Sequence, residues 1–97
     1  MFLTNQIELQ YGEIELLFNV PNNEQLTPIY LKSNELLSKG ELTPLDFAAM
    51  GELVAPLLEG ASKNWVTVPQ ITRDRLLFDV AKYILNESLS IPELKKK

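Results

Sequence analysis

The residues of this chain with the most chemical potential are its carboxylates. They gather in two stretches and include Glu8, Glu13, Glu15, Glu35, Glu41 and Asp46. Paired carboxylates can act as the general acid and base of a hydrolase, and clusters of them can bind a hard cation through oxygen ligands. None of them has the spacing of a calcium-binding loop, and the chain has no glycine-rich phosphate loop. We therefore interpret them as solvated surface charge, and a carboxylate-based hydrolase is the remote alternative.

Two residue types are missing from the chain, which has no cysteine and no histidine. Their absence excludes disulfides, thiol nucleophiles and thiolate metal sites, together with the usual general base and the commonest metal ligand. Most compact enzyme designs need one of these groups. We therefore expect a protein that is not an enzyme, uses no cofactor or metal, and has no small-molecule substrate.

The charge of the chain opposes nucleic acid as the main partner. Its formal net charge is −4 at pH 7, whereas proteins that bind DNA or RNA neutralise phosphates with Lys and Arg. The one basic cluster is Lys95–Lys97 at the end of the sequence, which we interpret as a solvated tail.

The composition is typical of a single small globular domain. The 97 residues are 45% hydrophobic and 23% charged, which is enough for one core. No apolar run approaches the roughly 18 residues that span a bilayer, and the N-terminal MFLTNQIELQ lacks the features of a signal peptide. We expect one domain over residues 1–97, in which residues 89–97 form a flexible or docking tail. We expect the protein to be located in the cytoplasm.

Residues 7–20 predict a β-hairpin. They read IELQYGEIELLFNV, which alternates with period two on both sides of Gly12 and Glu13. A two-residue type II′ turn there would place apolar pairs on one face and polar residues on the other, where Leu17 is the exception. Two strands alone are marginal in water, so we expect a third strand from residues 65–68 or from a neighbouring subunit. The predicted pairs are Tyr11 with Ile14, Leu9 with Leu16, Ile7 with Phe18, Glu8 with Leu17, and Gln10 with Glu15.

Three helices are predicted after the hairpin. Leu-Thr-Pro occurs at residues 26–28 and again at 42–44, where threonine can cap a helix and proline can occupy its first position. This predicts a loop over residues 22–25 and helices over residues 28–38 and 44–59. A third helix over residues 69–88 has apolar residues at helical spacing: Leu77, Val80, Ala81, Ile84 and Leu85. The fold class expected is α+β, with the hairpin packed on about three helices.

The predicted helix over residues 44–59 is unusually apolar. From Leu45 to Leu58 its only charged residues are Asp46 and Glu52, and such a helix must be covered on several sides. The domain's own elements could cover it. Because the short first helix and the hairpin offer limited apolar area, we expect instead that part of it is buried against another chain. The interface candidates are Phe47, Met50, Val54, Leu58 and Trp65, the last in a predicted connection flanked by polar residues.

The order of these elements resembles a family of phage proteins. YGEIELLFNVPNNEQL, followed by LTPLDFAAMGELVAPLL, is similar to the small tail assembly chaperones of tailed bacteriophages, in which a strand of the form xxIELxFxxP leads into an acidic helical part. The resemblance covers residues 6–60, and no functional residue can be carried over from it. It implies a non-catalytic protein that binds other phage proteins during assembly, in the host cytoplasm or in the virion.

Two functions of different classes follow from these observations. The first is a non-catalytic protein interaction module that works by self-association, as a homo-oligomer, or by binding a partner chain. The alternative is a small acidic inhibitor or regulator that occupies a basic groove of a nucleic-acid enzyme.

Overall fold

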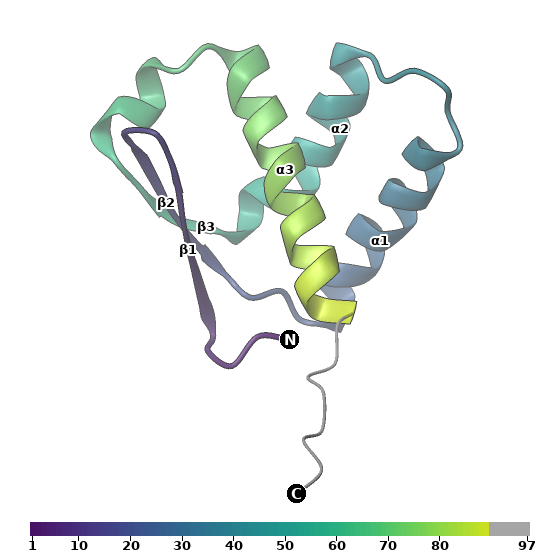
Figure 1. The fold of residues 1–97 in the computed structure, drawn as a ribbon, viewed down its shortest axis with the longest axis horizontal. Coiled ribbons are helices and arrows are strands. Elements are labelled where there is room, and N and C mark those ends of the chain that lie inside the picture. Colours follow the sequence, from purple (N-terminus) through teal and green to yellow (C-terminus); the bar gives the residue numbers. More distant parts are fainter. Residues whose placement is uncertain (90–97) are drawn as a thin grey trace, which may run out of the picture.

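The computed structural model describes residues 1–89. Figure 1 shows a small sheet on one side of a group of helices, which confirms the α+β class. In chain order the elements are β1 (Gln6–Tyr11), β2 (Ile14–Asn19), α1 (Asn23–Leu37), α2 (Pro44–Val54), the short 3-10 helix η1 (Ala55–Leu57), β3 (Leu58–Ala61), a second 3-10 helix η2 (Lys63–Thr67), and α3 (Gln70–Leu89). Leu89 ends α3, and the rest of the predicted tail, with Lys95–Lys97, lies outside the described residues.

The hairpin has the predicted register. β1 and β2 pair antiparallel without interruption from Tyr11 opposite Ile14 to Gln6 opposite Asn19. Gly12 has a φ of 63°, and Glu13 has no positive φ. This combination fits the type II′ turn and excludes type I′, which needs positive φ at both central residues. The turn therefore sets which face of each strand is buried.

The third strand exists, but not where it was predicted. β3 is formed by residues 58–61 and pairs antiparallel with β2, whereas residues 65–67 lie in η2. The prediction that α2 runs to residue 59 is wrong as well, because residues 58 and 59 belong to β3. Pro56 has no N–H to donate, so the α-helix ends at Val54 and a 3-10 turn leads the chain into the sheet. Leu17 pairs with Gly60 and Phe18 with Leu58, so Glu59 is the extra residue of a β-bulge.

Helix α1 begins five residues earlier than the Thr27-Pro28 pair predicts. Asn22 is its N-cap: the Asn22 Oδ1 accepts the Gln25 N–H at 2.9 Å, and the Gln25 Oε1 accepts the Asn22 N–H at 3.1 Å. These reciprocal bonds satisfy two backbone donors of the first turn. Pro28 therefore lies inside the helix, and the loop expected over residues 22–25 is its cap and first turn.

Helix α2 begins at Pro44 as predicted and packs antiparallel against α3. Phe47 contacts Phe78, and one turn later Gly51 faces Asp74 and Leu77. A Cβ atom on Gly51 would lie 3.3 Å from the Asp74 Oδ1 and 3.5 Å from the Leu77 Cδ1. The missing side chain at Gly51 therefore allows the two helices to approach this closely.

The apolar surface of α2 is mostly covered by the chain itself. Met50 and Val54 are only 1% and 0% exposed, so the expectation that they lie on an open stripe is wrong. Trp65 is also buried, and Phe47 and Leu58 are partly buried. The physical reason is the larger covering area: α1 is longer than predicted, and the sheet has a third strand from the same chain. All five residues predicted for the buried face of α3 are confirmed there.

Two substitutions on α2 test this assignment. Val54→Glu places an unpaired carboxylate in the core, which costs several kcal/mol out of a total stability of about 5–15 kcal/mol. We expect this variant to be unfolded in circular dichroism and thermal melting. The matched control Leu45→Glu changes a residue that is 81% exposed, and its stability should change by no more than about 0.5 kcal/mol. A folded Val54→Glu monomer would show that α2 has an open face.

Candidate functional site

The sheet has one buried face and one open face. On the buried face, Ile7, Leu16 and Phe18 are 4% exposed or less. Successive side chains of a strand point to opposite faces, so Glu8 and Leu17 lie on the other side. Glu8 is exposed and Leu17 is half-buried. No described helix covers this second face, which we call the outer face of the sheet (Figure 1).

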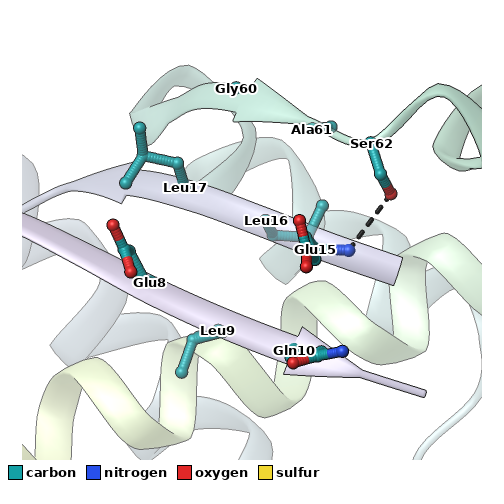
Figure 2. Close-up of a pocket in the computed structure, with 9 residues that line it drawn as sticks. All are labelled: Glu8, Leu9, Gln10, Glu15, Leu16, Leu17, Gly60, Ala61 and Ser62. Atoms are coloured by element: carbon teal, nitrogen blue, oxygen red, sulfur yellow. Dashed lines mark hydrogen bonds between the residues drawn. The ribbon is translucent and has the colours of Figure 1, made fainter. Parts of the chain in front are cut away.

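The outer face holds a shallow groove of about 530 Å³. Figure 2 shows Glu8, Gln10 and Glu15 around it, with Leu17 on β2 next to Gly60 on β3. Gly60 has no side chain to stand beside Leu17, so this part of the groove stays open. Its lining residues are Glu8, Leu9, Gln10, Glu15, Leu16, Leu17, Gly60, Ala61 and Ser62.

Ser62 closes one end of the groove. Its Oγ accepts the N–H of Glu15 at 3.1 Å, and its own N–H donates to the carbonyl oxygen of Glu15 at 2.9 Å (Figure 2). Both bonds hold the end of β3 against the beginning of β2. These two hydrogen bonds fix the backbone of Glu15, and with it the start of its side chain, beside the end of β3.

The charge of the outer face has one sign. β1 and β2 carry Glu8 and Glu15 and no Lys or Arg, and β3 adds Glu59 but no basic residue. Glu59 accepts a hydrogen bond from the Asn19 Nδ2 at 2.9 Å, which joins the bulge of β3 to the end of β2. No Lys or Arg lies on the three strands, so the sheet itself contributes only negative charge.

The arrangement is suited to binding, because the carboxylates of Glu8 and Glu15 are both exposed. Within residues 1–89, no group of three acidic side chains is placed to hold a metal ion. What the groove offers a ligand is negative charge, hydrogen-bonding groups and the apolar surface of Leu17.

The other predicted carboxylates are placed apart from this groove. Asp46 accepts hydrogen bonds from the Lys39 Nζ at 2.6 Å and from the Thr43 N–H at 2.8 Å. The Lys39 bond, followed by the Thr43 bond, lowers the pKa of Asp46 below its ordinary value of 3.8. The Glu35 pKa is also lowered, by its hydrogen bond and ion pair with Lys32. Asp46 therefore ties the connection between α1 and α2 to the first turn of α2.

The predicted interface residues do not form one patch. Phe47 makes an edge contact with Phe78, with ring centroids 5.0 Å apart, and the Arg75 guanidinium lies 5.2 Å from the Phe47 ring centroid. Leu58 and Trp65 line a different, smaller cavity of about 240 Å³ beside the start of α3. Met50 and Val54 belong to the core. An interface role for Phe47 and Leu58 stays a prediction.

Part of the groove had a signal in the sequence and part had none. Leu17 is the apolar exception on the polar face of the hairpin, and its side chain lines the groove. Gly60 and Ser62 were missed because the predicted helix ended at residue 59 and no strand was predicted over residues 58–61.

Comparison with protein-family models, with curated proteins and with solved structures finds no match to this chain. None of the helices within residues 1–89 combines the length and the apolar content needed to cross a bilayer.

Two adjacent leucines of β2 test the assignment of the two faces. Leu16 is in the core, so Leu16→Ala removes buried methyl groups and should cost about 2–5 kcal/mol. Leu17 faces the groove, and Leu17→Ala should cost at most about 1 kcal/mol. Urea unfolding of both variants measures the difference. Equal losses would mean that Leu17 is a core residue and that the groove is not an open surface.

The Asp46 ion pair predicts a pH effect on stability. Because the pKa of Asp46 is lowered in the folded chain, its contribution is fully present above its ordinary value of 3.8 and is lost as the pH falls below it. Asp46→Asn should therefore be less stable than the wild type at pH 7, and the difference should shrink near pH 3, in urea unfolding at both pH values. Glu41→Gln, an exposed change in the same connection, is the control. A difference independent of pH would contradict the role of the Asp46 charge.

Proposed function

We propose that this protein is a non-catalytic interaction module that binds a partner protein through the outer face of its sheet. The observation that supports this proposal is the groove of about 530 Å³, which combines exposed carboxylates with the half-buried Leu17. Protein interfaces have an apolar centre and a polar rim, and Leu17 with the carboxylates of Glu8 and Glu15 offers both kinds of surface. The surface of α2, by contrast, is largely used in the domain's own packing.

The charge of the outer face favours a basic partner over a second copy of the chain. Two such faces brought together would place glutamates against glutamates, and like-charge contacts oppose association. A partner with Lys or Arg side chains would instead neutralise Glu8, Glu15 and Glu59. Association through this face is therefore proposed to be with a different, basic protein surface.

The same observation supports the second candidate function, an acidic inhibitor. A protein that binds DNA or RNA carries a basic groove, and an acidic sheet could occupy it. The two functions share one binding surface and differ in what the partner does. The resemblance of residues 6–60 to tail assembly chaperones stays a prediction, under which the partner would be another phage protein.

A charge-reversal experiment tests the proposed surface. The double variant Glu8→Lys with Glu15→Lys reverses the charge of the groove, and Glu41→Lys with Glu52→Lys makes the same net change at exposed positions outside the sheet. Capture from the native host should yield a partner with the wild type and the control, and lose it with the sheet variant. Binding should weaken steeply between about 0.05 and 0.5 M salt.

Two further measurements complete this test. Circular dichroism of each variant establishes that it is folded. Addition of the captured partner's nucleic-acid substrate, if it has one, then distinguishes an inhibitor from an assembly factor. Equal capture by both double variants would contradict the proposed surface.

A further inference from the structure

Strand β1 is an edge of the sheet with free backbone groups. The strand order is β1-β2-β3, so within the described residues β1 has a neighbour on one side only. In an antiparallel pair, residues alternate between bonding across to the partner strand and pointing outward. The II′ turn makes Tyr11 and Ile14 a bonded pair, so Leu9 and Ile7 also bond to β2, and Gln6, Glu8 and Gln10 point their N–H and C=O groups outward.

Of the devices that usually protect an edge strand, β1 has only the charge of Glu8. Exposed edge strands commonly carry a proline, a lysine or a bulge that prevents pairing with another chain. β1 has six residues, none of them proline or lysine, and its pairing with β2 is unbroken along its length. Thr4 Oγ1 donates to the Gln6 carbonyl oxygen at 2.9 Å, which occupies one outward group at the beginning of the strand. The outward groups of Glu8 and Gln10 form the middle of the edge.

The two sides of this edge differ in chemistry. On the outer face, Glu8 and Gln10 border the acidic groove. On the inner side, Leu9 and Tyr11 are only partly buried and pack against the core. A strand added beside β1 would alternate its side chains between these surfaces.

We propose that the partner's binding segment is an extended chain that adds to β1 as a fourth strand, with Lys or Arg at alternate positions over Glu8 and apolar residues between them. This inference rests on the proposed function, because it uses the same acidic face. Main-chain hydrogen bonds supply affinity in this mode of recognition, and alternate side chains supply specificity. The charge of the strands selects the basic residues.

A second copy of this chain fits the edge less well. In the symmetric antiparallel pairing of β1 that uses all three outward residues, Glu8 lies directly opposite Glu8 of the second copy. Like charges in directly opposed positions destabilise a strand pair. The edge is therefore assigned to a basic partner.

Synthetic peptides test the mode of binding directly. The probe is a labelled eight-residue peptide in which Lys alternates with Val, and its control has the same composition with the four Lys grouped at one end. Fluorescence anisotropy with the full-length protein should show binding of the alternating peptide at least about fivefold tighter. Two N-methylated peptides should differ, one modified at its odd-numbered amides and the other at its even-numbered amides. Binding should be abolished in one of them and retained in the other, since only one set of amides faces β1.

A pair of substitutions at Gln10 tests the backbone edge without changing charge. Gln10→Pro removes an outward N–H that does not bond to β2, and proline is tolerated on edge strands. It should weaken peptide binding about fivefold to tenfold, the effect of one backbone hydrogen bond. Gln10→Thr keeps the N–H and should bind like the wild type. Hydrogen exchange should show protection of the Glu8 and Gln10 amides when the peptide is bound.

The outcomes separate this inference from the proposed function. If Glu8→Lys with Glu15→Lys weakens binding while Gln10→Pro and both N-methylated peptides do not, the acidic face binds its partner and strand addition is wrong. Equal binding of alternating and grouped peptides would also overturn strand addition. If the charge reversal has no effect on the partner captured from the host, the proposed function itself fails.

Discussion

The alternation of side chains along β2 is the constraint on which the rest of this structure depends. Leu16 and Phe18 point into the core, so Glu15 and Leu17 must point out. A register slip of one residue would exchange the two sets and bury a carboxylate, which makes the observed register strongly preferred. The Gly12 turn sets this register at the start of the hairpin. Core and candidate binding face are therefore two results of one geometric rule.

The groove beside the hairpin depends on Pro56. By ending α2 it releases residues 58–61 to pair with β2, and the bulge at Glu59 and the small Gly60 leave space beside Leu17. β3 pairs with the side of β2 that faces away from β1, so β1 and β3 are the two edges of the sheet within the described residues. Without β3, the groove would have no wall beside Leu17.

The proposed function uses the chemistry of recognition. Exposed carboxylates on a sheet without basic residues can attract a basic partner and orient it, and the free backbone groups of β1 can hold it in place. The helices support this surface from the other side of the sheet, because their apolar residues pack against its buried face.

Local chemistry in the sequence was sufficient for the hairpin register, the start of α2 at Thr43-Pro44 and the buried face of α3, because turn geometry, capping and helical periodicity act between near neighbours. The turn register and the alternation of side chains also placed Glu8, Glu15 and Leu17 on one face of the hairpin. Only the tertiary structure decided that residues 58–61 form a strand, since four residues become a strand by pairing with β2, which lies about 40 residues earlier in the chain. It also decided that Met50 and Val54 are core residues. An apolar side chain has the same sequence signature in either place, and its burial depends on what packs against it.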